Sequence, residues 1–111
     1  MEFKVSKEFS DAIGAVFQVS RDEAEEITKI DGVENATLTC EMCPFQMEGT
    51  LDGLPFYFRE RWDRWSLSVG EDPVMIRRDG TNGFYVEGIF SGDHSADFKK
   101  AVEAWRETKN K

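Results

Sequence analysis

The chain holds few side chains of the types that most often act as metal ligands or nucleophiles: two cysteines and one histidine, His94. Cys40 and Cys43 form a C-x-x-C motif, whose spacing can bind zinc or form a redox-active disulfide. A structural zinc site takes four ligands, more than two thiols and one imidazole supply. A redox motif normally begins a helix, whereas this one lies between two predicted strands. We therefore interpret Cys40 and Cys43 as reduced cysteines beside a turn, keep a metal or redox site as an alternative, and expect no cofactor.

His94 lies near the start of a predicted C-terminal helix. Catalysis by a histidine needs an acid that orients the ring and a nucleophile within reach. Ser91, Asp93 and Ser95 are close to it in sequence, but closeness in sequence does not make a catalytic triad. We interpret His94 as a capping or loop residue and expect the protein not to be an enzyme.

The strongest structural signal is the dipeptide Asp52-Gly53, which lies between the strand-like runs Phe45–Leu51 and Leu54–Trp62. Asp-Gly favours a type I′ turn, because this turn needs positive φ at both central residues. A two-residue turn here fixes the register of a β-hairpin and places Gly49 opposite Phe56. Register in turn decides which side chains share a face, since side chains alternate with period two.

A second hairpin is predicted with its turn at Asp63-Arg64, which pairs Trp62 with Trp65 and Glu60 with Leu67. One face of the two hairpins is then apolar, and it is formed by Phe45, Met47, Gly49, Leu51, Leu54, Phe56, Phe58, Trp62, Trp65, Leu67 and Val69. The opposite face is polar and carries Tyr57, Arg59 and Arg61.

Glu60 is the exception, because the same alternation places it on the apolar face. An acid in such surroundings can have a raised pKa and can carry chemistry. The alternative is that Glu60 reaches solvent at the margin of the sheet or pairs with an arginine.

Helices are predicted on either side of the sheet in sequence. A first helix with an apolar stripe is predicted up to Phe17, and the capping box Ser20-Arg21-Asp22-Glu23 predicts a second helix that ends near Gly32. A C-terminal helix is predicted over His94–Thr108. The strand-like segments are Ala36–Glu41, Phe45–Leu51, Leu54–Trp62, Trp65–Val69, Val74–Arg77 and Phe84–Phe90. We predict a single α+β domain over residues 1–111: an antiparallel β-meander of about five strands with N-terminal helices and a C-terminal helix packed on one face.

The net charge of −8 is unevenly distributed. Residues 1–55 hold twelve acids and four bases, whereas residues 56–111 hold ten of each. Direct binding of nucleic acid through the acidic half is disfavoured, since phosphates attract Lys and Arg. No run approaches the roughly 20 apolar residues of a membrane-spanning helix, and the N-terminus does not read as a secretory signal. We expect a soluble, cytoplasmic protein that binds neither nucleic acid nor membranes.

Two groups of charged residues are candidate binding sites for another protein. The first is an acidic ridge on the second predicted helix and the segment after it, formed by Asp22, Glu23, Glu25, Glu26, Asp31 and Glu34. It would attract a basic partner. The second is the group Tyr57, Arg59 and Arg61, since arginine beside an aromatic ring is common at interface hot spots. A basic, aromatic sheet face can also bind single-stranded nucleic acid, and both groups have the alternative of being solvated surface.

The block Pro44-Phe45-Gln46, Glu48-Gly49-Thr50, Asp52-Gly53, Pro55-Phe56-Tyr57-Phe58-Arg59 and Trp65-Ser66-Leu67 resembles small uncharacterised bacterial and phage proteins that share a PFQ-x-EGT-x-DG-x-PFYFR stretch. The resemblance covers about a quarter of the chain. It implies a shared hairpin core and transfers no activity. Small acidic phage proteins of this size often inhibit host machinery, anti-CRISPR proteins among them, and that analogy is associational.

The leading hypothesis is therefore a small acidic protein-binding module, monomeric or homodimeric, that occludes a basic nucleic-acid-binding surface of a partner. It would be an inhibitor of the anti-CRISPR kind, encoded by a phage or mobile element. The alternative is a small enzyme or ligand-binding domain that uses Glu60 with the neighbouring Arg59 or Arg61, or a metal or redox site at Cys40 and Cys43.

Overall fold

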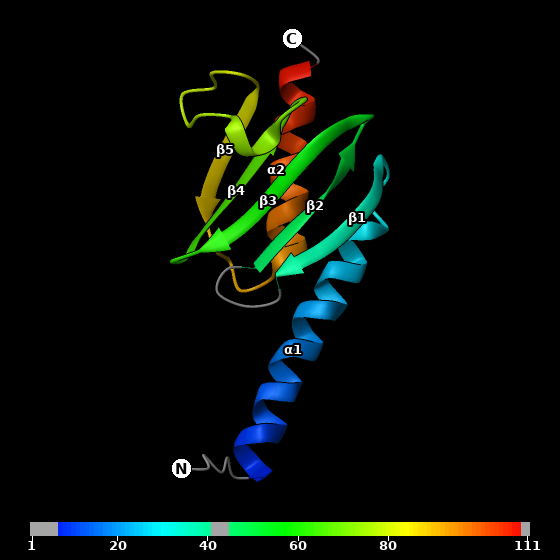
Figure 1. The fold of residues 1–111 in the computed structure, drawn as a ribbon, viewed down its shortest axis with the longest axis vertical. Helices are drawn as coiled ribbons and strands as arrows, with labels where there is room; N and C mark the ends of the chain where they lie inside the picture. Colours follow the sequence, from blue (N-terminus) through cyan, green and yellow to red (C-terminus); the bar gives the residue numbers. More distant parts are fainter. Residues whose placement is uncertain (1–6, 41–44, 110–111) are drawn as a thin grey trace.

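Five antiparallel strands form one sheet in sequence order, and the helices pack on one of its faces (Figure 1). The computed structural model describes residues 7–40 and 45–109, and side chains of the first helix from residue 18 on. The elements are α1 (Lys7–Thr28), β1 (Val33–Cys40), β2 (Phe45–Leu51), β3 (Leu54–Arg61), β4 (Arg64–Val69), the 3₁₀ helix η1 (Pro73–Met75), β5 (Phe84–Ile89) and α2 (His94–Lys109). The predicted α+β meander is confirmed.

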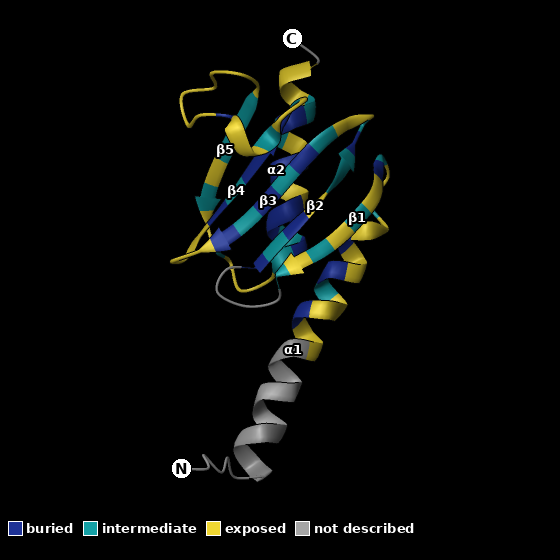
Figure 2. Ribbon diagram, viewed as in Figure 1, coloured by how far each residue is buried: buried dark blue, intermediate teal, exposed yellow. Residues whose placement is uncertain are grey.

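The turn at Asp52-Gly53 joins β2 and β3 as predicted. Asp52 has φ 51° and Gly53 has φ 86°, as a type I′ turn requires. The strands pair without a register shift, and Met47 lies opposite Phe58. Phe56, Phe58 and Trp65 are all buried, and buried residues alternate with less buried ones along β3 (Figure 2).

The second turn is formed by Trp62-Asp63 and not by Asp63-Arg64, so this prediction was wrong by one residue. Both turn residues have positive φ, and Arg61 pairs with Arg64. Moving a two-residue turn by one position moves each cross-strand partner by two, so every strand residue keeps its face. Glu60 therefore stays on the helix-covered face, now opposite Trp65, while Trp62 leaves that face and is 79% exposed.

The positive φ of Trp62 is unusual for a bulky residue and is unfavourable. The observed register brings Leu67 opposite Phe58 and Val69 opposite Phe56. All four side chains are at most 2% exposed, and burial of large apolar side chains is worth about 1.5–3 kcal/mol each. Both registers place these four side chains on the helix-covered face, so their burial tolerates the strain at Trp62 but does not by itself fix the position of the turn.

The N-terminal part forms one helix, and the predicted break at Ser20 is absent. Ser20 is a buried residue inside α1, on the same stripe as Ala24 and Ile27. Spacings of four and seven residues place all three on one helix face. A serine is small enough to lie on such a face, so a capping-box pattern did not mark a helix start here.

A second difference from the sequence analysis lies after β4. Pro73–Met75 form a 3₁₀ helix where a strand over Val74–Arg77 had been predicted.

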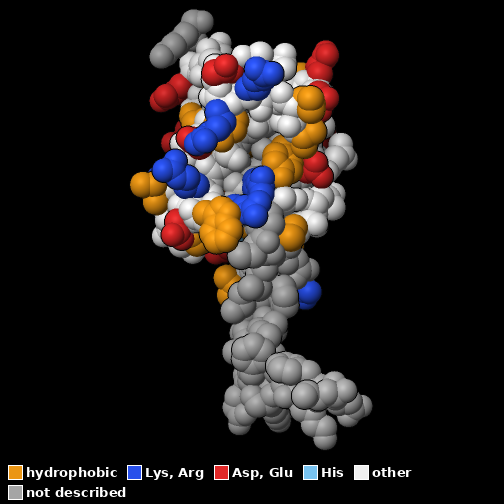
Figure 3. Space-filling view, turned by 60° about the vertical axis from the view of Figure 1, so that its left-hand side comes forward, with side chains coloured by type: hydrophobic (Ala, Val, Ile, Leu, Met, Phe, Trp, Pro, Cys, Tyr) orange, Lys and Arg blue, Asp and Glu red, His pale blue; other side chains and the backbone are white. Residues whose placement is uncertain are grey.

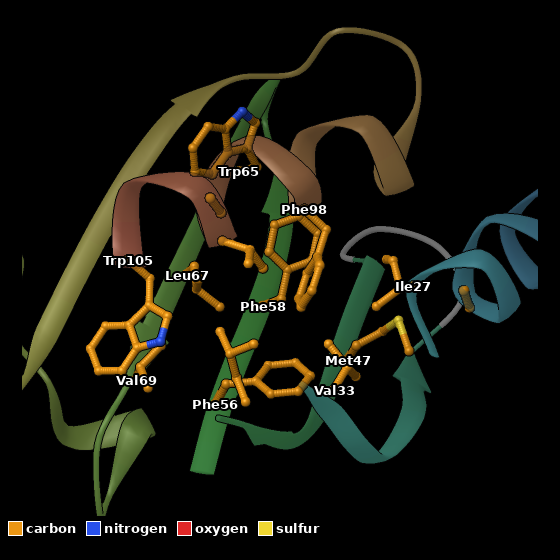
Figure 4. Packing of buried hydrophobic residues seen from close by; sticks show 14 of the residues in the cluster. Ile27, Val33, Met47, Phe56, Phe58, Trp65, Leu67, Val69, Phe98 and Trp105 are labelled. Carbon is orange, nitrogen blue, oxygen red and sulfur yellow. The ribbon is translucent and has the colours of Figure 1, made fainter. Parts of the chain in front are cut away.

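The core lies between the sheet and the helices (Figure 4). Phe98 of α2 contacts both central rings of β3, with ring centroids 5.3 Å from Phe56 and 5.1 Å from Phe58. The buried cluster consists of Ala24, Ile27, Val33, Phe45, Met47, Leu51, Phe56, Phe58, Trp65, Leu67, Val69, Phe98, Ala101, Val102 and Trp105. Neither helix, over its described residues, has an apolar stretch long enough to cross a membrane.

The carboxylate of Asp52 ties the first turn to the end of α2. It accepts hydrogen bonds from Trp105 Nε1 at 3.0 Å and from Arg106 Nη2 at 3.1 Å, and Lys109 Nζ lies 3.5 Å away. Arg106 also donates to the carbonyl of Asp31, at the α1–β1 connection. The hydrogen bond from Arg106 is the main reason why the pKa of Asp52 is lowered. One turn residue thus joins the sheet to α2.

Replacing Asp52 with Asn should destabilise the protein at neutral pH by about 1.5–3 kcal/mol, the usual worth of hydrogen bonds to a charged group. Asn tolerates positive φ, so the turn itself should persist. A lowered pKa means that the carboxylate stabilises the fold above its unfolded pKa, and that this contribution is lost as pH falls through the folded value. The difference between wild type and Asp52→Asn should therefore shrink below about pH 4.

Urea unfolding at pH 7 and pH 3 measures both effects. The matched control is Asp63→Asn, in the other turn, which should change stability little at either pH. An equal loss for Asp52→Asn at both pH values would show that its charge is not what links the turn to α2.

Candidate functional site

Buried acid and imidazole groups meet where β3 and both helices converge. The side chain of Glu60, in β3, is only 5% exposed, and its Oε2 makes a short hydrogen bond with Nδ1 of His94, the first residue of α2. On its other side, Nε2 of His94 lies 3.7 Å from Oε2 of Glu23 in α1. One imidazole therefore connects three elements that are far apart in the sequence.

Aromatic stacking holds the His94 ring in place. The ring lies parallel to Phe45, with centroids 3.8 Å apart and an interplanar angle of 9°. Phe90 stacks on it as well, at 5.0 Å and 19°. Burial between apolar rings disfavours the charged imidazolium, and it lowers the pKa of His94 despite the nearby carboxylates.

Asp97, one helical turn after His94, completes the cluster and is fully buried. Its Oδ2 accepts a hydrogen bond from the backbone N–H of Ser91 at 3.1 Å. Asp97 Oδ1 and Glu60 Oε1 are both buried, and within the described residues neither receives a hydrogen bond from an N–H or hydroxyl donor. Two such carboxyl oxygens are satisfied together when one group keeps its proton and donates it to the other.

Glu60 is the group that keeps the proton. Burial raises its pKa to about 9, and hydrogen bonding to Asp97 and the negative charges of Asp97 and Glu23 act in the same direction. A protonated Glu60 donates to Asp97 through one oxygen and accepts from His94 Nδ1–H through the other. Ser91 N–H, Asp97, Glu60 and His94 then form one continuous chain of hydrogen bonds.

This arrangement differs from the enzyme alternative, which paired Glu60 with Arg59 or Arg61. The two arginines flank Glu60 in sequence, so they project from the opposite face of β3 and cannot share a cleft with it. The structure brings Glu60 to His94 instead, which had been interpreted as a capping or loop residue. The capping oxygen is that of Asp93, whose Oδ1 accepts from Ser95 N at 2.9 Å. The spacing of His94 and Asp97 on one helix face was the signal that could have indicated a shared site.

The remaining predicted chemistry lies elsewhere. Cys40 ends β1 and is half-buried, and Cys43 is outside the described residues, so the C-x-x-C motif stays a prediction. Among the side chains that the structure describes, those of residues 18–40 and 45–109, no three His, Cys, Asp or Glu are arranged to hold a metal ion.

The predicted acidic ridge is divided by the structure. Glu23 turns inward to His94, and its side chain is 17% exposed. The other members are exposed: Asp22, Glu25, Glu26, Asp31 and Glu34. Lys29 lies 3.5 Å from Glu26 and 4.0 Å from Glu25, so part of the negative charge is compensated locally. We call the five exposed acids the acidic exterior.

The face of the sheet that the helices leave uncovered carries a second candidate site, which we call the arginine hollow. It is an open depression of about 350 Å³, lined by Arg59, Arg61, Trp62, Arg64, Trp65, Ser66, Arg78, Tyr85 and Glu87. Figure 3 shows Lys and Arg side chains in blue gathered on this side of the molecule, with hydrophobic side chains in orange among them. Arg59 and Arg61 of the predicted group line it, while Tyr57, two residues before Arg59 in β3, does not.

Strand register explains the shape and charge of the arginine hollow. Ser66 of β4 lies between Arg59 of β3 and Glu87 of β5, so a short side chain is flanked by long ones. At the end of the hairpin, Arg61 lies directly opposite Arg64. Like charges that face each other across a strand pair are destabilising, so this arrangement opposes folding.

Glu87 is the one carboxylate in the arginine hollow, and it is already bound. Arg78 Nη2 lies 2.8 and 2.9 Å from its two oxygens, and Tyr85 donates from its hydroxyl at 2.9 Å. Hydrogen bonding to Arg78 is the main reason why the pKa of Glu87 is lowered. Arg64 Nη1 is more distant, at 3.8 Å.

Comparison with protein-family models, curated protein sequences and solved structures gives no significant match to this chain. Its function therefore has to be argued from the two sites themselves.

Replacing Glu60 with Gln should change how stability depends on pH. The folded state keeps the Glu60 proton up to about pH 9, whereas an unfolded glutamate loses it near its ordinary pKa of 4.5. Stability from this group is thus fully present at low pH and falls as pH rises between these values, by at most about 1.4 kcal/mol per pH unit. Gln has the same shape, carries no charge, and can still donate to Asp97 and accept from His94.

Thermal or urea unfolding between pH 5 and pH 9 tests this. Glu60→Gln should gain stability relative to wild type as pH rises, while the control Glu48→Gln, at an exposed position in β2, should follow wild type. Parallel curves for wild type and Glu60→Gln would mean that Glu60 is ionised in the folded protein at neutral pH.

Proposed function

We propose that this protein is a non-catalytic binding module whose uncovered sheet face docks onto a partner protein. The observation that carries the proposal is the arginine hollow beside the exposed indole of Trp62. The acid–imidazole cluster consists of Glu23, Glu60, His94 and Asp97. It supports the non-catalytic part of the proposal indirectly, because its groups are buried among the helices and link α1, β3 and α2 to one another.

Residue types favour a protein interface on this face. Arg, Trp and Tyr are the residues most enriched at binding hot spots, and all three meet in the arginine hollow. Trp62 is 79% exposed, and the guanidinium of Arg61 lies 5.4 Å from the centre of its ring. A large aromatic ring at the tip of a rigid hairpin is well placed to enter a pocket on another protein.

Charge indicates what the partner would offer. The arginine hollow contains four arginines and one carboxylate, so it would attract a negatively charged group. The chain as a whole has a net charge of −8, which disfavours a long polyanion at a distance. These two facts together favour a partner protein with an acidic side chain over a nucleic acid.

The acidic exterior supports a second candidate function. Its five exposed acids on α1, the following turn and β1 would dock on a basic surface. If that surface binds nucleic acid, docking would block it by occupancy, as in an inhibitor of the anti-CRISPR kind. Exposed charge with partial local compensation is weaker support than a hollow bordered by an exposed tryptophan, so this remains second.

Replacing Trp62 with Ala should weaken partner binding by about tenfold or more, the effect of losing a hot-spot side chain. The fold should persist, because Trp62 contributes little to the core. Affinity capture from cells that contain the sequence, followed by titration of the captured protein, measures the effect. Val74→Ala is the control, since Val74 is 61% exposed on η1, outside the arginine hollow.

The double variant Glu25→Lys, Glu26→Lys separates the two candidates. Loss of binding in this variant, with Trp62→Ala unaffected, would favour the acidic exterior as the interface. Full binding by all three variants would leave neither surface as the docking site.

A further inference from the structure

We infer that the arginine hollow is a phosphate site and that it recognises a phosphorylated side chain of the partner protein. This inference rests on the proposed function and names the chemical group that the uncovered face would bind. It follows from the charge inside the arginine hollow, one buried donor that lacks an acceptor, and the small size of the site.

The internal charge balance favours a dianion over a single carboxylate. Glu87 is held by Arg78 through two short contacts, so this pair is largely neutral. Three guanidinium groups then remain around Ser66, those of Arg59, Arg61 and Arg64. A phosphate monoester carries about −1.5 to −2 charges at neutral pH, and a carboxylate only one.

The available donors suit an anion with three acceptor oxygens. Arg59 Nε is buried and has no hydrogen-bond partner within the described part of the chain. A buried donor without an acceptor needs an explanation, and a bound oxygen would provide one. Ser66, directly opposite Arg59 across the β3–β4 pair, also lines the arginine hollow, and its hydroxyl interacts with the side chain of Tyr85.

The pairing of Arg61 with Arg64 supports the same inference. Two positive side chains facing each other at the end of the hairpin repel in the unbound protein. An anion bound between the two guanidinium groups would attract both and so offset their mutual repulsion. Arginine is also the residue best suited to phosphate, because its planar fork donates two parallel hydrogen bonds.

The surroundings favour one phosphate over a chain of phosphates. Acidic side chains lie around the basic region in Figure 3, and Asp63 and Asp79 directly neighbour Trp62, Arg64 and Arg78 in sequence. A nucleic acid strand leaving the arginine hollow would meet these carboxylates. A single phosphorylated side chain on a protein segment would not, and the exposed ring of Trp62 could pack against that segment.

The direct test titrates the full chain, labelled with nitrogen-15, and follows its NMR spectrum. The probes are inorganic phosphate, a short phosphoserine peptide, the same peptide with Glu in place of phosphoserine, and a single-stranded oligothymidylate. We expect saturable shifts of the Arg59 Nε–H and Ser66 amide signals with phosphate. The phosphoserine peptide should bind at least about tenfold more tightly than the Glu peptide.

Matched variants assign the site. Arg59→Gln and Arg64→Gln should each weaken the phosphopeptide by about tenfold, and Arg77→Gln should not, since Arg77 is exposed but does not line the arginine hollow. Glu87→Gln should strengthen binding, because it releases Arg78 and removes a competing negative charge.

The other outcomes overturn the inference in distinguishable ways. Equal binding of the Glu and phosphoserine peptides would make the arginine hollow a general carboxylate site and leave the proposed function standing. If neither peptide bound while partner capture still depended on Trp62, the phosphate site would be overturned and the proposed function would stand. Tighter binding of the oligothymidylate than of the phosphopeptide, lost in Arg59→Gln, would identify a single-stranded nucleic acid site and would overturn the proposed function as well.

Discussion

Strict alternation of side chains along β3 is the constraint on which the rest of the structure depends. The type I′ turn at Asp52-Gly53 fixes this alternation from one end. Phe56 and Phe58 thereby face the helices and form the core, and Glu60 faces the same way. Arg59 and Arg61 face the opposite side. A slip of one residue would exchange the two sets, exposing the rings and burying the guanidinium groups, so the core, the acid cluster and the arginine hollow share one origin.

The acid–imidazole cluster shows how the core accommodates polar side chains. Two ionised carboxylates side by side in the core would be strongly unfavourable, and protonation of Glu60, together with hydrogen bonds to His94 and from Ser91 N–H, avoids that. Such a network constrains the helices more narrowly than apolar packing does, because hydrogen bonds need particular distances and directions. It therefore orients α1 and α2 on the sheet, whereas the apolar side chains mainly supply the free energy of packing.

Local patterns in the sequence predicted the meander, the first hairpin and the buried stripe of α2, since each depends on spacing within one segment. They did not predict the turn at Trp62-Asp63, because it needs a positive φ at Trp62, which a bulky residue rarely adopts. Glu60 was placed on the correct face, but its contact with His94, 34 residues away, depends on where α2 crosses the sheet. Likewise, Arg78 and Glu87 reach the arginine hollow from a loop and from β5, which no pattern within β3 could indicate.

The stack of Phe45, His94 and Phe90 has a magnetic consequence. An imidazole stacked nearly parallel to two phenyl rings is shielded by their ring currents. The carbon-bound protons of His94, the only histidine in the chain, should therefore resonate well upfield of their positions in an unstructured peptide. That single displaced pair of signals would report whether the start of α2 is packed against β2, without any label or substitution.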